Sequence, residues 1–329
     1  MGQQAYTTQA RPVRLLAAGG TISMQGEHAV PTLDAAGLVA AIPELARFED
    51  LTAENVLGLP GPQISLEQGL ELVGQAAGAA ARGEGTVITT GTDTLEELAM
   101  LGALLHDGEA PVVFTGANRP ASAPGADGPA NLLDAVAVAA APAAAGLGTL
   151  VVFGGEILAA TAARKVESTG PSAFGAPVAG PIGRVVEGRL WLHARPVRHR
   201  TLKPTAITHN VAIVSAALGE RGDLLRAAAE TADGVVVEAF GAGHLTPGML
   251  HALHDVVARL PVVITVAPER GSMMHATYGF EGAERDVRSS GAVCAPFLSA
   301  RAARIALLCC LGAGLDRDAI ATALAPWDA

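Results

Sequence analysis

Lysine and aromatic side chains are scarce in this chain of 329 residues. Among its 22 basic residues only Lys165 and Lys203 are lysines, and aromatic residues make up 3% of the sequence. Tyrosine occurs twice, as Tyr6 and Tyr278. Because arginine does not lose its proton in proteins and lysine can, the scarcity of lysine narrows the search for a catalytic base.

The chain also lacks an excess of positive charge, a disulfide framework and a long apolar run. Its 22 basic and 32 acidic residues give a formal net charge of −10, which argues against nucleic acid or an anionic membrane as a partner. Of the three cysteines, Cys294, Cys309 and Cys310, the adjacent pair Cys309 and Cys310 lies in an apolar run and is predicted to be core thiols, and the lack of a disulfide framework suits a reducing compartment. With no secretory signal or membrane-spanning stretch visible in the sequence, we expect a cytoplasmic protein.

Short apolar runs rich in β-branched residues alternate with longer segments rich in alanine and leucine. The runs predicted as strands lie at 13–18, 86–90, 111–116, 149–155, 211–217, 234–240 and 261–267. Helices are predicted between them, for example at 65–83 and 246–260. Continuous apolar strands separated by helices indicate a mostly parallel sheet covered on both faces, so the predicted fold class is α/β.

The segment 188–210 interrupts this alternation. It is basic, contains two prolines and is predicted to form a hairpin followed by a linker. We therefore expect a boundary near residue 200, between a larger N-terminal α/β domain at 1–200 and a smaller C-terminal α/β domain at 201–329. Ligands of α/β folds bind where the carboxyl ends of strands meet helix N-termini, so candidate residues are sought there.

Gly19, Gly20 and Thr21 end the first predicted strand. Two glycines allow a sharp turn and a close approach of the backbone to a ligand, and Thr21 then projects from the strand end. The alternative is a tight turn in which Thr21 makes only local hydrogen bonds. The stretch is neither a dinucleotide fingerprint nor a P-loop, because G-x-G-x-x-G and G-K-[ST] are missing here.

A second polar turn, Thr-Gly-Thr-Asp-Thr at 90–94, follows the next predicted strand. Thr94 and Glu97 fit a capping box at the start of a helix, which explains part of this polarity. Thr92 and Asp93 precede the cap beside helix N–H groups, where a hydroxyl and a carboxylate could bind an amine and activate a nucleophile. A plain Asx or Ser/Thr turn is the alternative interpretation.

Lys165 lies beside Arg164 in the segment Ala-Arg-Lys-Val-Glu. A threonine hydroxyl is a weak nucleophile at pH 7 and needs a neighbouring base, for which a neutral lysine qualifies. Lys165 is therefore the candidate base. A surface lysine on a loop is the alternative.

Three stretches, taken in order, resemble the bacterial-type L-asparaginase/glutaminase family. They are AAGGTIS at 17–23, VITTGTDTLEE at 87–97 and VVFTGANRPASAPGADGPANLLDA at 112–135. The first two are specific in combination, and the Arg-Pro and Asp-Gly-Pro-x-Asn-Leu of the third add to that specificity. The resemblance implies an amidohydrolase that converts asparagine, glutamine or a related small amide to the acid and ammonia.

The resemblance also implies roles for individual residues. Thr21 would be the acylated nucleophile, and Thr92, Asp93 and Lys165 would form a second catalytic cluster. The implied substrate-binding positions are Gly20, Gly91, Thr92, Asp93, Ala117, Gln63 and Glu284. In the family the residue at the place of Glu284 reaches into a neighbouring subunit's site, which implies a homodimer or homotetramer.

Two family features differ in this sequence. The tyrosine that the family carries shortly after the first threonine is absent from 23–37, and Gly61-Pro62-Gln63 stands where the family has a Ser-Gln pair for the substrate carboxylate. A weakly active or inactive homologue that binds a small amino acid as a sensor or scaffold is therefore an alternative. An amidase subunit of a tRNA-linked amidotransferase is disfavoured, because no extra domain or basic face for tRNA is visible.

Histidines do not form a metal-binding pattern in the sequence. His251 and His254 share a predicted helix without a third ligand, and H-E-x-x-H does not occur. We therefore expect no metal and no cofactor. His244, in the glycine-rich turn at 238–246, lies close to the position of an asparagine in the family.

Replacing Lys165 by arginine tests whether this lysine serves as a base. Guanidinium keeps the positive charge but does not deprotonate, so a catalytic Lys165 predicts a loss of turnover of about 10²- to 10⁴-fold in Lys165→Arg. Ammonia release from asparagine and glutamine measures the loss, and Lys203→Arg is the matched control. Unimpaired turnover in Lys165→Arg would refute the role.

Overall fold

The computed structural model describes residues 11–26 and 30–328, and the chain divides into two compact units. Unit 1 is Met1–Thr201 and unit 2 is Leu202–Ala329, and each has its own sheet and hydrophobic core. The α/β class predicted from the sequence is confirmed. The larger unit carries a mostly parallel sheet, and the smaller unit carries a parallel one.

Unit 1 is built on an eight-stranded sheet. Its strands are β1 Val13–Gly19, β4 Leu51–Leu59, β5 Gly85–Thr89, β6 Val112–Thr115, β7 Thr149–Phe153, β8 Glu156–Ala159, β11 Gly183–Val186 and β12 Arg189–Leu192. Their order is β12-β11-β8-β7-β6-β5-β1-β4. Pairing is parallel from β4 to β7 and antiparallel from β7 to β12.

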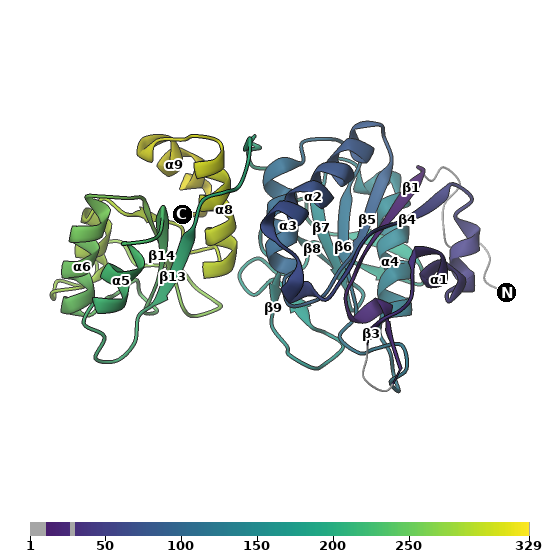
Figure 1. Cartoon of the computed structure of the whole chain (residues 1–329), viewed down its shortest axis with the longest axis horizontal. Helices are drawn as coiled ribbons and strands as arrows, with labels where there is room; N and C mark the ends of the chain where they lie inside the picture. The colour runs from purple at the N-terminus through teal and green to yellow at the C-terminus, as the bar shows by residue number, and fades with distance from the viewer. Residues whose placement is uncertain (1–10, 27–29, 329) are drawn as a thin grey trace. The chain divides into compact units, whose positions relative to one another are not determined.

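Helices cover both faces of this sheet, as the continuous apolar strands require. They are α1 Ala35–Ala40, α2 Leu66–Ala81, α3 Leu95–Leu105 and α4 Gly128–Ala140. In Figure 1, α2 and α3 lie together on one face, and α4 lies on the other. Strands β5, β6 and β7, which lie between these layers, are buried along their whole length.

Single-turn helices and two-residue strands join the main elements. They are η1 Thr21–Ser23, η2 Pro43–Arg47, η3 Gly61–Gln63 and η4 Pro142–Ala144, with the antiparallel pairs β2 Met24–Gln25 with β3 Val30–Pro31 and β9 Arg164–Lys165 with β10 Phe174–Gly175. The segment 23–37, where the family tyrosine is missing, contains the first pair. Residues 27–29 within it and Tyr6 lie outside the described residues.

The connections reverse direction across β1. From β1 the chain crosses to β4 on one side and then returns to β5, β6 and β7 on the other side. A crevice forms outside the carboxyl ends of parallel strands at such a reversal. The carboxyl ends of β4, β1, β5 and β6 are therefore where this fold places a site.

Unit 2 has a four-stranded parallel sheet in the order β13-β14-β15-β16, between α5 and α6 on one face and α8 on the other (Figure 1). Its elements are β13 Val211–Ser215, α5 Asp223–Ala228, β14 Gly234–Ala239, α6 Pro247–Val257, β15 Val262–Val266, α7 Glu284–Ser289, β16 Val293–Cys294, α8 Ala300–Gly312, α9 Arg317–Leu324 and η5 Ala325–Trp327. Cys309 and Cys310 are fully buried in α8, and burial raises the pKa of each thiol to about 12. The prediction of core thiols is confirmed.

Every run predicted as a strand forms one, but β4, β8 and the two-residue strands β2, β3, β9, β10 and β16 lie outside the predicted runs, and the edge strand β4 is the longest of them. Most residues of β4 are exposed, so its sequence lacks the apolar run that marks the buried strands. The hairpin predicted at 188–210 begins earlier, with β11 pairing to β12. The differences at β4 and at this hairpin arise at the two edges of the sheet and not in its buried centre.

The capping box predicted at Thr94 and Glu97 is wrong. Helix α3 has no side-chain hydrogen bond at its N-cap, because the Thr94 hydroxyl donates to the carbonyl oxygen of Gly61 at 3.2 Å. A reciprocal capping box forms instead at Ser65 and Gln68 on α2. The Thr94 side chain therefore links the end of β4 to the start of α3 and does not cap the helix that it precedes.

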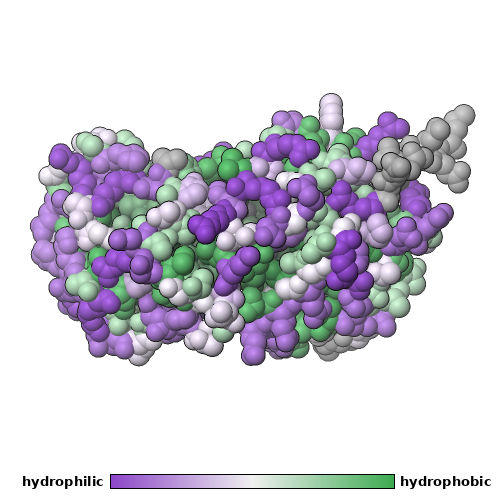
Figure 2. Space-filling view, turned by 90° about the horizontal axis from the view of Figure 1, so that it is seen from above, coloured by the Kyte–Doolittle hydropathy of each residue, from purple (hydrophilic) through white to green (hydrophobic). Residues whose placement is uncertain are grey.

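Figure 2 shows one face of the molecule, on which hydrophilic and hydrophobic residues are interspersed. Several large apolar side chains are exposed. They include Trp191, Val197, Leu218 and Leu224. No helix among the described residues is long and apolar enough to cross a membrane.

A methyl group at Gly91 tests how tightly the strand ends are packed. A Cβ atom there would lie 2.6 Å from the backbone nitrogen of Gly61 and 2.8 Å from its Cα, so backbone must move. We expect Gly91→Ala to lower the free energy of unfolding by about 1–3 kcal/mol, measured by denaturant titration. Gly74→Ala in α2 is the matched control: nothing lies within 4 Å of its Cβ position, and better helix propensity should stabilise by about 0.8–1 kcal/mol. Equal effects of the two variants would contradict the packing argument.

Candidate active site

Three glycine turns meet at the carboxyl ends of β1, β4 and β5. A Cβ atom on Gly20 would lie 2.3 Å from the nitrogen of Gly91, and one on Gly91 would lie 2.6 Å from the nitrogen of Gly61. Gly20 also has a φ of 81°, which side-chain-bearing residues rarely adopt. The residues that follow these glycines are thereby brought together, which places Thr21 beside the turn that carries Thr92.

Thr92, Asp93 and Lys165 form a hydrogen-bonded cluster at this edge of the sheet. Lys165 Nζ donates to Thr92 Oγ1 at 2.9 Å and to Asp93 Oδ1 at 2.8 Å. The side chain of Lys165 is 17% exposed and that of Asp93 is 62% exposed. The amine is thus largely enclosed beside a threonine hydroxyl, while the carboxylate of Asp93 stays accessible to a ligand.

Lys165 is held on a short hairpin rather than on a loop. It pairs with Phe174 across the antiparallel strands β9 and β10, and the rings of Phe153 and Phe174 lie 5.1 Å apart. Its main-chain N–H donates to the carboxylate of Glu96 in α3 at 2.9 Å. The backbone of the lysine is therefore fixed against the helix that follows Thr92.

The Asp-Gly-Pro-x-Asn motif holds the turn after β6. The carboxylate of Asp127 accepts the main-chain N–H groups of Asn118 at 3.0 Å and of Arg119 at 2.8 Å, and Asn131 Nδ2 donates to the carbonyl of Gly116 at 3.0 Å. These bonds fix the main chain around Ala117. The polar residues of the motif thus serve the turn rather than a ligand.

Ala117 is fully buried and lies close to the Thr21 turn. A Cβ atom on Gly128 would lie 2.9 Å from Ile22 Cγ1 and 3.3 Å from Ala117 Cβ, so the start of α4 packs against both. Gln63 follows Gly61 in η3, and its side chain is exposed. Ala117, Gln63, Gly20 and Gly91 therefore all lie close to the carboxyl ends of β6, β4, β1 and β5.

Glu284 lies in unit 2, at the start of α7, and its side chain is fully buried. Its Oε1 accepts the N–H groups of Thr277 at 2.6 Å and Tyr278 at 2.8 Å, and its Oε2 lies 3.2 Å from His244 Nε2. Burial opposes ionisation, but the backbone hydrogen bonds and His244 together hold the pKa of Glu284 below its usual range. The carboxylate of Glu284 therefore anchors the segment 277–284, within which the side chain of Tyr278 is partly exposed.

Three residues of this site were not predicted from the sequence: Glu96, Asn118 and Asp127. Glu96 is adjacent to Glu97, which the sequence analysis assigned to a capping box. The carboxylate of Glu96 accepts the main-chain N–H of Lys165. Asn118 Oδ1 accepts a hydrogen bond from Thr92 Oγ1 at 3.2 Å. An asparagine in a turn carries no signal of such a contact, because its partner is distant in the sequence.

Both parts of the chain match known protein families. Residues 12–198 match the family described as "Asparaginase, N-terminal", and residues 210–324 match the "Glutaminase/Asparaginase C-terminal domain". The chain belongs to the asparaginase family. The resemblance seen in the sequence motifs is confirmed.

Individual relatives agree with this family. A protein of Deinococcus radiodurans named "Probable L-asparaginase" is 36% identical over 317 residues, covering 93% of this chain and 94% of the relative. The "L-asparaginase" of Bacillus licheniformis is 30% identical over 314 residues, with 90% and 94% covered. A solved structure, "Probable Cytoplasmic L-asparaginase from Campylobacter jejuni", superposes with a TM-score of 0.86 at 26% identity and covers 96% of this chain and 99% of its own.

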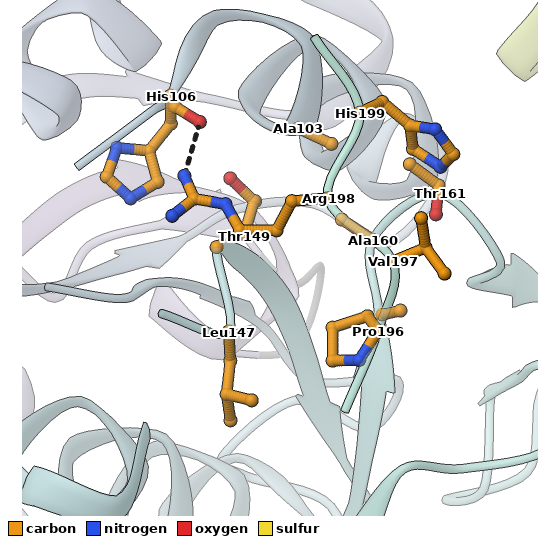
Figure 3. Close-up of a pocket in the computed structure, with 12 residues that line it drawn as sticks. Ala103, His106, Leu147, Thr149, Ala160, Thr161, Pro196, Val197, Arg198 and His199 are labelled. Carbon is orange, nitrogen blue, oxygen red and sulfur yellow. Dashed lines mark hydrogen bonds between the residues drawn. The ribbon is translucent and has the colours of Figure 1, made fainter. Parts of the chain in front are cut away.

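Figure 3 shows a hollow that is separate from the predicted site residues. It lies between the end of α3, the start of β7, the end of β8 and the segment 196–199. Arg198 spans it and donates to the main-chain oxygen atoms of His106 at 3.2 Å and Gly108 at 3.1 Å. Since β7 begins here and is parallel to β6, this hollow is at the edge opposite Thr92. Within unit 1, Arg198 ties the segment 196–199 to the turn that follows α3.

The pair His251 and His254 lies on α6, and His251 Nε2 is 3.0 Å from Glu281 Oε1. Within residues 11–26 and 30–328, no group of three or more His, Cys, Asp or Glu side chains is arranged to hold a metal ion.

Proposed function

We propose that the chain is an amidohydrolase that converts L-asparagine, L-glutamine or a related small amide to the acid and ammonia. The observation that carries this proposal is the contact of Lys165 Nζ with Thr92 Oγ1 and Asp93 Oδ1 beside the Thr21 turn. A hydroxyl, an enclosed amine and a carboxylate that orients the amine are the parts that nucleophilic catalysis requires. Relatives named L-asparaginase and glutaminase-asparaginase support this substrate class.

In the proposed reaction Thr21 Oγ1 attacks the carboxamide carbon, and the C–N bond of the tetrahedral intermediate then breaks. Ammonia leaves after the proton that Thr21 lost is returned from Lys165, through Thr92, to its nitrogen, and the acyl group stays on Thr21 as an ester. Water hydrolyses this ester to the acid and regenerates the threonine. In this scheme, main-chain N–H groups at the glycine turns stabilise the negative oxygen of each tetrahedral intermediate.

Thr92 and Lys165 have a proton-transfer role in this scheme. A neutral Lys165 takes the proton of Thr92, and Thr92 in turn takes the proton of the attacking hydroxyl or water. Asp93 orients the amine and, with its exposed carboxylate, binds the α-amino group of the substrate. Gly20, Gly91, Ala117 and Gln63 contact the substrate at the strand ends.

A weakly active homologue that only binds an amino acid is the alternative. The intact cluster of Thr92, Asp93 and Lys165 disfavours it, because a binding protein has no need for an enclosed amine on a threonine hydroxyl. Ammonia release from asparagine and glutamine separates the two. Thermal stabilisation by an amino acid without any ammonia release would favour the binding protein.

We also propose that the enzyme is a homodimer or homotetramer of the cytoplasm in which unit 2 serves a partner subunit. The Campylobacter jejuni relative is named cytoplasmic, whereas a Haemophilus influenzae relative, 29% identical over 308 residues, is named periplasmic. Because the carboxylate of Glu284 is buried within its own chain, its contribution to a partner's site passes through the segment 277–284 that it anchors.

Substitution of the two threonines tests the catalytic proposal. Thr21→Ala and Thr92→Val should each lower kcat by about 10³-fold or more, because a nucleophile and its activator act as one unit. Unfolding midpoints should move little, since neither change opens a large cavity. The control is Thr52→Val on β4, which lacks a role at the site. A Thr21→Ala protein that keeps most of its turnover would end the assignment of the nucleophile.

Mixing two inactive proteins tests the shared site. Thr21→Ala and Glu284→Gln proteins, combined under conditions of subunit exchange, form a mixed dimer with one site carrying both changes and one carrying neither. Random pairing should then restore about one quarter of the wild-type rate, since half of the dimers are mixed and each has one intact site. No recovery after exchange has been shown by mass labelling would mean that each chain completes its own site.

A further inference from the structure

The side-chain amide of Asn118 connects three separate segments of unit 1. Its Oδ1 accepts a hydrogen bond from Thr92 Oγ1 at 3.2 Å, and its Nδ2 donates to the carbonyl oxygens of Ser168 at 3.1 Å and Gly170 at 2.8 Å. The last two residues follow Lys165 in the turn between β9 and β10. One amide therefore contacts the threonine on one side and the lysine hairpin on the other.

The chemistry of the partners fixes the direction of every proton in this network. Carbonyl oxygens only accept hydrogen bonds, so the NH₂ group of Asn118 must face Ser168 and Gly170, and its oxygen must face Thr92. An ammonium group only donates, so charged Lys165 requires a lone pair of Thr92 Oγ1. The hydroxyl proton of Thr92 must then point at Asn118 and away from Lys165.

We propose that Asn118 is a positioning residue for Thr92: its amide oxygen holds the Thr92 hydroxyl in one orientation, while its NH₂ group stabilises the turn of the lysine hairpin. This inference rests on the proposed function. With its proton held by Asn118, Thr92 keeps one lone pair for Lys165 and presents the other to a ligand hydroxyl or water. When Lys165 is neutral its amine can accept, and the Thr92 hydroxyl then turns from the amide to the amine to pass its proton; once Lys165 is charged, Asn118 again sets the orientation of the hydroxyl.

The main chain around Asn118 does not need this side chain for its own conformation. Asp127 accepts the main-chain N–H groups of Asn118 and Arg119, and Asn131 binds the carbonyl of Gly116. Lys165 is likewise held by Glu96 and by its pairing with Phe174. The amide of Asn118 is thus the added element that couples two turns which are already formed.

Asn118→Leu removes both the amide oxygen that accepts from Thr92 and the NH₂ group that donates to Ser168 and Gly170, while it keeps a similar side-chain volume. If Asn118 orients Thr92, kcat should fall by about 10- to 100-fold, because a small misplacement of a catalytic group has effects of that size. KM should change by less than about threefold, since Asn118 does not bind the substrate in this scheme. Steady-state ammonia release from asparagine and glutamine gives both constants.

Asn118→Asp separates the two ends of the amide. A carboxylate still accepts the Thr92 hydroxyl, but it has no N–H for the carbonyls of Ser168 and Gly170. We expect Asn118→Asp to recover most of the kcat lost in Asn118→Leu, with a lower unfolding midpoint than the wild type. Because Asn118→Asp adds a negative charge near the Lys165 ammonium group, it can shift the pH dependence of activity, so kcat is compared at the plateau of a full pH profile.

Asn55→Leu is the matched control, because Asn55 Oδ1 accepts a main-chain N–H from Ala35 at 2.7 Å without any contact to the two threonines. It should leave kcat unchanged. Wild-type kcat in Asn118→Leu, equal losses in Asn118→Leu and Asn118→Asp, or a change confined to KM would each overturn the positioning role. Absence of ammonia release from the wild-type chain would instead reject the proposed function itself.

Discussion

Close packing of backbone against backbone, at Gly20, Gly61 and Gly91, is the constraint on which the site depends. Three strand ends can approach so closely only where no side chain stands between them, and a single methyl group at two of these positions would meet backbone nitrogen at 2.6 Å or less. This contact turns the general crevice at the carboxyl edge of a parallel sheet into a specific arrangement of Thr21, Thr92 and the turn at 61. The spacing of the proposed catalytic residues is thus set by glycines, which carry no reactive side chain.

The second level of organisation is polar and is built on this packing. Asp127 and Asn131 hold the turn after β6, and Glu96 holds the main chain of Lys165. Each of these side chains bonds to main-chain atoms, so each sets the position of a neighbouring segment. Because an enclosed amine needs partners to remain hydrogen-bonded, the contacts of Lys165 with Thr92 and Asp93 complete the arrangement.

The sequence allowed the fold class, the buried strands and the threonine turns to be predicted, because each depends on local pattern. Runs of apolar residues identify β5, β6 and β7, and a glycine followed by threonine identifies the turns. Among contacts distant in sequence, only the cluster of Lys165 with Thr92 and Asp93 was predicted, and that came from the family resemblance. Thr94 fitted a local capping rule yet bonds to Gly61, 33 residues away, and Glu96 and Asn118 gain their roles from partners about 69 and 26 residues distant. The exposed edge strand β4 was missed because its mixture of polar and apolar residues forms neither a continuous apolar run nor a regular alternation.

The short turn at 61–63 has a consequence for how such an enzyme can evolve. Main-chain hydrogen bonds from Gln63 to Pro60 and from Ile64 to Gly61 form it, and Thr94 binds the carbonyl of Gly61, so its shape does not rely on the side chains of Pro62 and Gln63. Both of these side chains are exposed. Mutations there can accumulate without loss of folding, and they fall at the strand ends beside the two threonines. Under the proposed function, in which Gln63 contacts the substrate, selection can therefore explore new preferences among small amides at these two positions while the glycine contacts and the lysine hairpin stay unchanged.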